Sequence, residues 1–200
     1  MPIATTSPVT GEVIETFDEL PAERLERCLE LARVGAATMA ATSPQQRAGW
    51  MSALATLLDA EADDLAATMT TEVGKPLAAS RAEVAQCAAA CRFYARHAAG
   101  FLAPEPVDAA AVGAAAAYTV YQPLGPVLAV MPWNFPLWQA ARFAVPALMA
   151  GNVGLLKPAS NVPRTALRLA ELIGRAGFPA GAFQTLLIGA DQVEAVLADR

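Results

Sequence analysis

The feature of this sequence that most constrains its fold is a regular alternation of apolar runs and helical patterns in its carboxyl-terminal part. The apolar runs cover 126–133, 152–158 and 183–190, and the helical patterns cover 136–150, 162–177 and 191–200. Strands that alternate with helices of this length form right-handed βαβ units and a parallel sheet. We therefore predict an α/β fold, and we expect the first run to be a strand buried on both faces.

The preceding residues, 1–122, have a different pattern. Residues 3–17 predict an extended hairpin arm, because Pro8, Thr10 and Gly11 separate two strand-like runs. Helical patterns opened by prolines then follow to about residue 97, and residues 117–122 alternate as a strand. We therefore expect two units, 1–122 as an arm with a helical layer and 123–200 as part of a nucleotide-binding sheet. Three strands make that sheet incomplete, because doubly wound sheets usually have about five or more.

Composition excludes several classes of protein. The 14 basic residues are scattered and the net charge is −5, which argues against a nucleic-acid partner. The most apolar stretch, 124–156, contains four prolines and Arg142, which argues against a membrane span. The amino terminus has no signal-peptide pattern, and the three cysteines follow no disulfide or zinc spacing. We expect a cytoplasmic protein.

Polar side chains follow the predicted strands at the edge where ligands of open parallel sheets bind. Trp133 and Asn134 follow the first strand, residues 157–160 the second, and Gly189 and Ala190 the third. An amide, an ammonium group, a hydroxyl and a glycine before a helix suit a nucleotide. The chain has no GxGxxG fingerprint, so these residues alone predict only a nucleotide-binding α/β domain.

Four segments carry a resemblance to a known family: TEVGKPLAASRAEV (71–84), MPWNFPLWQ (131–139), GLLKPAS (154–160) and GFPAGAFQTLLIG (177–189). They resemble segments of the aldehyde dehydrogenase superfamily, in the same order and at the same spacing, and the likeness spans essentially the whole chain. One departure is Gln184, where the family usually has Asn. The resemblance implies an aldehyde dehydrogenase-like fold, with an amino-terminal helical layer followed by the first βαβαβ part of a Rossmann-like sheet.

The resemblance implies a catalytic role for Asn134. Its side-chain amide would donate a hydrogen bond to the aldehyde oxygen that becomes negative when a catalytic cysteine attacks. Loss of such a donor costs about 2.7–4 kcal/mol of barrier. The alternative is that Asn134 only turns the chain.

The resemblance also implies a cofactor site formed by Trp133, Asn134 and the run Lys157, Pro158, Ala159 and Ser160. Many relatives that prefer NAD have Glu at the position of Ser160, and a carboxylate there would repel a 2′-phosphate. Serine removes that repulsion and Lys157 adds a positive charge. We therefore expect NADP as cofactor, with NAD as the alternative.

Arg142 is the expected substrate-binding residue. It is the one charge in an apolar helical pattern, so we expect it to be buried and to need a partner. The sequence most resembles succinate-semialdehyde dehydrogenases, in which an arginine at the matching position helps to bind the substrate carboxylate. The alternative is a structural ion pair with an acid beyond these residues.

No metal site is expected. Cys87 and Cys91 share a helix face, but His97 lies off it, and two thiols are too few for zinc. Lys75 is predicted to be a turn residue without chemistry.

Three hypotheses follow for function. The first is the amino-terminal part of an NADP-preferring enzyme that oxidises succinate semialdehyde or a similar aldehyde to the acid, as a homo-oligomer (dimer or tetramer). The second is a non-catalytic fragment that binds nucleotide or docks with subunits through residues 3–17 and 117–122, since the family's catalytic cysteine and glutamate segments are not in these 200 residues. The third is an aldehyde dehydrogenase with another substrate.

Overall fold

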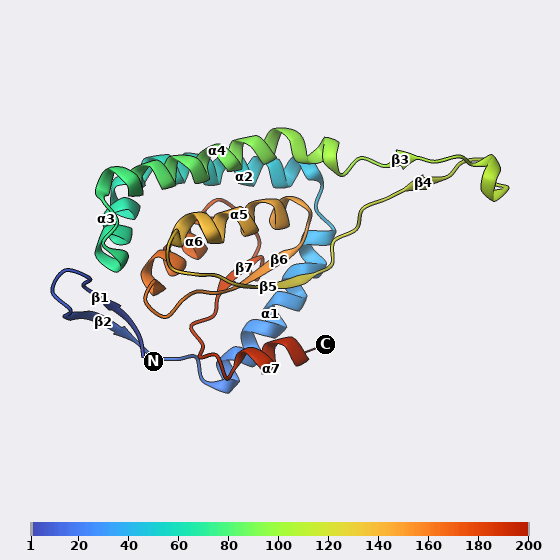
Figure 1. Ribbon diagram of the computed structural model, residues 1–200. Helices are drawn as coiled ribbons and strands as arrows, with labels where there is room; N and C mark the ends of the chain where they lie inside the picture. The colour runs from blue at the N-terminus through green and yellow to red at the C-terminus, as the bar shows by residue number, and fades with distance from the viewer. Residues whose placement is uncertain (1, 200) are drawn as a thin grey trace.

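The computed structural model describes residues 2–199 and has the predicted α/β architecture (Figure 1). The strands are β1 (Ile3–Thr6), β2 (Val13–Phe17), β3 (Glu105–Pro106), β4 (Tyr118–Thr119), β5 (Pro126–Val130), β6 (Val153–Lys157) and β7 (Phe183–Thr185). The helices are α1 (Ala22–Ala40), α2 (Pro44–Ala60), α3 (Ala62–Val73), α4 (Leu77–Phe101), α5 (Pro136–Met149), α6 (Pro163–Arg175) and α7 (Val193–Ala198), with a 3-10 turn at Ala110–Val112.

The central sheet is parallel and has the order β5-β6-β7. This confirms the predicted βαβαβ unit. Strand β6 is central, and four of its five residues are buried. The expectation that β5 is buried on both faces was wrong, because β5 is an edge strand and only Ala129 in it is buried. Strand β7 is shorter than its apolar run, since pairing ends at Thr185.

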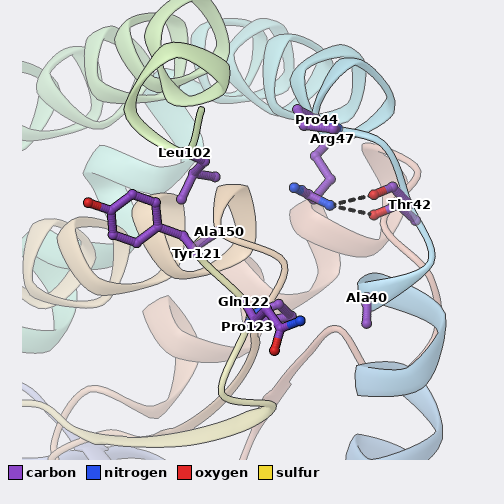
Figure 2. Close-up of a pocket in the computed structure, with 9 residues that line it drawn as sticks. All are labelled: Ala40, Thr42, Pro44, Arg47, Leu102, Tyr121, Gln122, Pro123 and Ala150. Carbon is purple, nitrogen blue, oxygen red and sulfur yellow. Dashed lines mark hydrogen bonds between the residues drawn. The ribbon is translucent and has the colours of Figure 1, made fainter. Parts of the chain in front are cut away.

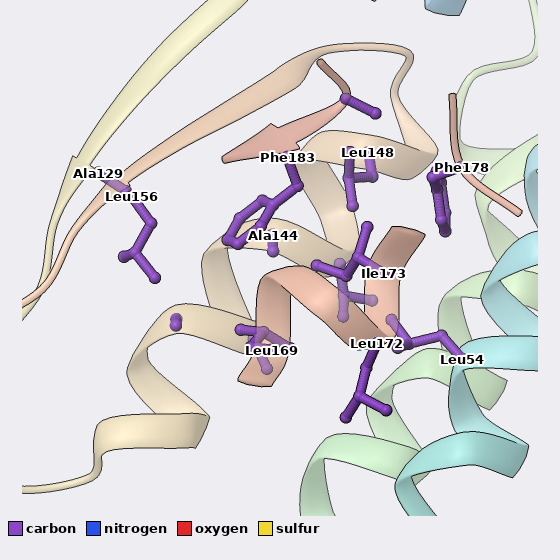
Figure 3. Packing of buried hydrophobic residues seen from close by; sticks show 14 of the residues in the cluster. Leu54, Ala129, Ala144, Leu148, Leu156, Leu169, Leu172, Ile173, Phe178 and Phe183 are labelled. Atoms are coloured by element: carbon purple, nitrogen blue, oxygen red, sulfur yellow. The ribbon is translucent and has the colours of Figure 1, made fainter. Parts of the chain in front are cut away.

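Helices cover both faces of this sheet (Figure 1). Helix α1 packs on one face, α5 and α6 pack on the other, and α2, α3 and α4 form an outer layer over α5 and α6. Leu169, Leu172 and Ile173 of α6 fill the space between the sheet and the outer layer, beside Leu54 of α2 and Phe183 of β7 (Figure 3). The buried cluster therefore runs through residues on both sides of 122/123, and the division into two units there stays a prediction.

Close backbone packing holds α1 to the carboxyl-terminal half. A Cβ added at Gly35 would lie 2.8 Å from the backbone carbon of Gly181, so only glycine fits there. The Gln184 side chain, the departure noted above, donates a hydrogen bond to the Cys28 carbonyl of α1 (2.8 Å). This bond gives Gln184 a structural partner.

In the amino-terminal part the predicted hairpin is confirmed, and a local cap sets the start of α2. Strands β1 and β2 form the antiparallel hairpin of the expected arm. Ser43 caps α2 in a capping box with Gln46, and Pro44 occupies the first turn.

The segment between α4 and β5 projects away from the body of the molecule (Figure 1). The predicted strand at 117–122 is real but short, because only Tyr118 and Thr119 pair, with Glu105 and Pro106. Across residues 2–199, none of the helices has both the length and the apolar composition needed to span a bilayer.

Candidate functional site

The carboxyl ends of β5 and β6 meet at one edge of the sheet. Val130 and Lys157 are register partners, and the Met131 N–H donates to the Lys157 carbonyl (3.0 Å). Trp133, Asn134 and Ser160 lie in the loops that begin after Val130 and Lys157, so they follow strand ends that lie at the same edge of the sheet. Both Trp133 and Asn134 are exposed.

The loop after β6 is held from two sides. The Lys157 ammonium donates to the Pro158 carbonyl (3.1 Å), and the Val162 N–H donates to the Ala159 carbonyl (3.1 Å). The Ser160 carbonyl accepts from the N–H of Ala4 in β1 (3.0 Å), so the hairpin arm is anchored to this loop. The backbone of the loop is thus fixed while Lys157 and Ser160 stay partly accessible.

A buried carboxylate, which sequence analysis missed, caps the helix that follows this loop. Glu72, at the end of α3, accepts the N–H groups of Arg164 (2.7 Å) and Thr165 (3.1 Å) in the first turn of α6. It also accepts the hydroxyls of Thr165 (2.5 Å) and Thr5 (3.2 Å). Burial raises the pKa of Glu72, against the opposing effect of these four donors. One side chain therefore joins the arm, the outer layer and the start of α6.

A second buried carboxylate caps the helix that follows Asn134. Glu83 of α4 accepts the N–H groups of Leu137 (3.0 Å) and Trp138 (2.8 Å) at the start of α5. Its other oxygen pairs with the Lys75 ammonium, which also lies 3.8 Å from the centre of the Phe135 ring. Lys75 lies in the turn between α3 and α4, as predicted, and these two contacts give it a structural role that the sequence did not suggest. Both Lys75 and Glu83 lie in the segment 71–84, one of the four that resemble the family. This resemblance is the signal in the sequence that could have pointed to them.

Arg142 is placed differently from the expectation. It is exposed on the side of α5 that faces away from the core, and the prediction of a buried guanidinium was wrong. The helix buries its other faces, which explains its apolar composition. Within residues 2–199 no acid lies within ion-pair distance of Arg142.

Asn134 and Arg142 line the same pocket, which has a volume of about 380 Å³. Gln86 of α4, Phe135, Trp138 and Gln139 complete its lining. No hydrogen-bond partner for the Asn134 amide occurs among residues 2–199. The pocket thus offers an amide donor at one position and a cation at another, a pair that suits a small molecule with an oxygen at one end and an anion at the other.

A different pocket, of about 490 Å³, lies near the opposite end of α5 (Figure 2). Its one charged side chain, Arg47, donates to the carbonyls of Met149 (2.9 Å) and Thr42 (2.6 Å), near the carboxyl ends of α5 and α1. Burial lowers the pKa of Arg47. The carboxyl end of a helix stabilises a cation, so Arg47 has a structural role here. None of the residues that line this pocket is a predicted site residue.

The other positions considered in the sequence contribute less to the site. The Gly189 N–H donates a hydrogen bond to the side-chain oxygen of Gln192 (3.3 Å), and Gln192 is the N-cap of α7. Cys87 and Cys91 are buried, and burial raises the pKa of both thiols, that of Cys91 to about 12. No cluster of three or more potential metal ligands occurs in residues 2–199.

Comparison with known proteins gives a consistent result. The sequence profile described as "Aldehyde dehydrogenase family" matches residues 1–200. The chain is 58% identical over 199 residues to "Succinate-semialdehyde dehydrogenase [NADP(+)] 1" of Mycobacterium tuberculosis, covering all of this chain and 44% of that protein. It is 56% identical over 207 residues to "Succinate-semialdehyde dehydrogenase [NADP(+)]" of Mycobacterium avium, covering all of this chain and 42% of that protein.

A solved structure agrees with these relatives. The crystal structure of succinic semialdehyde dehydrogenase from Streptococcus pyogenes, in complex with NADP+, superimposes with a TM-score of 0.93 at 35% identity, over 99% of this chain and 43% of that chain. The chain thus spans less than half the length of the relatives it matches. The sequence profile, the relatives and the fold together show that this chain belongs to the aldehyde dehydrogenase family.

Proposed function

We propose that this chain is the amino-terminal part of an NADP-preferring aldehyde dehydrogenase that oxidises succinate semialdehyde, or a similar aldehyde with a distal carboxylate, to the acid. The observation that carries the proposal is the pocket shared by Asn134 and Arg142, whose guanidinium has no acidic partner among residues 2–199. The names of the most similar relatives support the same substrate and cofactor. The division into an oligomerisation-type unit at 1–122 and the first part of the cofactor domain at 123–200 belongs to this proposal.

The chain's own residues would bind and polarise the substrate. The Asn134 amide would donate to the aldehyde oxygen as it becomes negative during nucleophilic attack, which lowers the barrier because the donor is already in place. The Arg142 guanidinium would pair with the substrate carboxylate and fix the orientation of the molecule in the pocket.

The residues after β6 fit NADP. Positions 157–160 contain a lysine and a serine and no acid, so no carboxylate in this loop opposes a 2′-phosphate. Lys157 and Ser160 would hold the adenosine ribose and its phosphate, with Trp133, Pro158 and Ala159 shaping the edge. The bound cofactor would supply the hydride acceptor.

Substrate discrimination tests the proposal. In the complete protein, NADPH formation is followed with succinate semialdehyde and with propanal. Arg142→Leu should lower kcat/KM for succinate semialdehyde by about 10- to 100-fold, as expected for a lost charge-assisted hydrogen bond, and should leave propanal turnover within about 2-fold. Arg81→Leu, which removes an exposed arginine of α4 that pairs with Asp63, is the matched control and should leave kcat/KM unchanged for both substrates. No turnover of any semialdehyde by the wild-type protein would refute the proposed function.

A homo-oligomeric state, dimer or tetramer, is a further part of the proposal. The projecting segment between α4 and β5 exposes Val107, Val112, Tyr118 and Val120, and apolar side chains gathered on one projecting segment suit a contact between subunits. Sedimentation of the complete protein should give a dimer or tetramer, and Val112→Asp together with Tyr118→Asp should shift it toward smaller species. A wild-type monomer would contradict this part.

A further inference from the structure

Asn134 lies in a turn, residues 131–135, that leads into α5 and is contacted at its last residue, Phe135, by Lys75. Lys75 lies between α3 and α4, and Glu83 lies two turns into α4. The Glu83 side chain is 1% exposed and the Lys75 side chain 13% exposed, so their ion pair is largely removed from water. Neither residue lines the pocket that contains Asn134.

The two residues hold the chain that directly follows Asn134. Glu83 accepts the N–H groups of Leu137 and Trp138, three and four residues after Asn134. The Lys75 ammonium lies against the ring of Phe135, the next residue along the chain. Fixing the start of α5 and the neighbouring ring leaves the backbone of Asn134 little freedom to rotate.

Lys75 is the necessary member of this group because it supplies the positive charge that balances Glu83. In the described part of the chain, no second basic side chain lies within ion-pair distance of Glu83. A buried carboxylate that loses its only cation is strongly disfavoured, so the cap on α5 would weaken or take on water. The consequence would reach Asn134 through the first turn of α5.

We propose that Lys75 is a positioning residue for the reaction, which acts through Glu83 and Phe135 to hold the Asn134 amide in the orientation that stabilises the oxyanion. This inference rests on the proposed function of Asn134. The Lys75 ammonium contacts the turn directly at the Phe135 ring, 3.8 Å from its centre, and reaches the start of α5 through its buried ion pair with Glu83.

A double-mutant cycle in the complete protein tests this. Lys75→Met should lower kcat with succinate semialdehyde by about 10- to 100-fold, the loss expected from a displacement of the donor on the order of 1 Å. The KM for NADP should stay within about 2-fold, since Lys75 does not contact residues 157–160. In an Asn134→Ala background, the same change should lower kcat by less than about 2-fold, because there is no longer a donor to position.

Each outcome has a distinct meaning. A Lys75→Met effect that is the same in both backgrounds would overturn the inference and leave Asn134 in its proposed role. An Asn134→Ala protein with undiminished kcat would instead overturn the proposed function. Arg81→Met, in the helix that carries Glu83 but paired with exposed Asp63, is the matched control and should leave kcat unchanged in both backgrounds.

A second variant covers the case in which Lys75→Met does not fold. Phe135→Leu removes the ring beneath the ammonium and leaves the Lys75–Glu83 pair and the cap on α5 intact. It should reproduce the loss of kcat in the wild-type background and have little effect in the Asn134→Ala background. A loss of kcat for Phe135→Leu that is the same in the wild-type and Asn134→Ala backgrounds would overturn the inference.

Discussion

Replacement of Glu72 by alanine should destabilise the protein more than any single exposed acid can. The Glu72 carboxylate accepts four hydrogen bonds, from the backbone of Arg164 and Thr165 and from the hydroxyls of Thr5 and Thr165. In the alanine variant these donors, which lie where β1, α3 and α6 meet, lose their acceptor.

The size of the effect can be worked from these contacts. Loss of a helix N-cap costs about 0.5–2 kcal/mol. A buried donor left without an acceptor costs about 1–3 kcal/mol. Removal of a buried carboxylate, whose raised pKa shows that its charge is disfavoured there, offsets part of the sum. We therefore expect the free energy of unfolding to fall by about 2–4 kcal/mol for Glu72→Ala, and by about half as much for Glu72→Gln, which keeps one acceptor oxygen.

The assay is urea unfolding of the complete protein followed by circular dichroism, with NADP affinity measured in parallel. Asp63→Ala is the control, since Asp63 lies in the same helix but is highly exposed in its ion pair, and its loss should cost less than about 1 kcal/mol. Affinity for NADP should fall in the Glu72 variant because the loop at 157–162 leads directly into the capped helix. If Glu72→Ala and Asp63→Ala lowered the free energy of unfolding by the same small amount, the reasoning would be refuted.

Three further predictions follow from close packing, burial and proton linkage. Gly35→Ala should lower the free energy of unfolding by about 1–3 kcal/mol, because its Cβ would meet backbone; Gly49→Ala, in a helix with open space, should raise it by about 0.5–1 kcal/mol, and melting of both variants checks the contrast. Because burial raises the pKa of Glu72, the folded protein binds that proton more tightly than the unfolded chain. The stability advantage of wild type over Glu72→Gln should therefore be largest at acidic pH and shrink as the pH rises through the raised pKa, and an advantage that grows with pH in urea titrations would contradict it. Cys87 and Cys91 should resist a thiol reagent until the protein unfolds, because both are buried with raised pKa values; rapid labelling of either in the native state, read by mass spectrometry, would count against their placement.

Local patterns predicted the elements that depend on local chemistry. The capping box at Ser43 and the left-handed glycine at Gly74 mark helix ends within a few residues, so α2 and α3 could be placed from the sequence. Strand β6 was predictable because both of its faces are covered, which requires a continuous apolar run. The same pattern misled at β5, since an apolar run does not show whether the strand has a neighbour on both sides.

The side chains that organise the site were harder to predict. Glu72 and Glu83 each cap a helix more than fifty residues away along the chain, and no spacing rule reaches that far. The expectation that Arg142 is buried rests on the composition of its helix alone. An apolar helix can still keep one exposed stripe, and only the packing of α5 shows that Arg142 lies on it.

The most direct test of the account is titration of the complete protein with NADP and with NAD, repeated for Ser160→Glu. The account predicts saturable binding that favours NADP, and a Ser160→Glu protein in which NADP binds at least about 10-fold more weakly while NAD binding is retained, because a carboxylate next to the 2′-phosphate repels it. Equal affinity for the two nucleotides, with no response to Ser160→Glu, would contradict the placement of the cofactor at the carboxyl ends of β5 and β6.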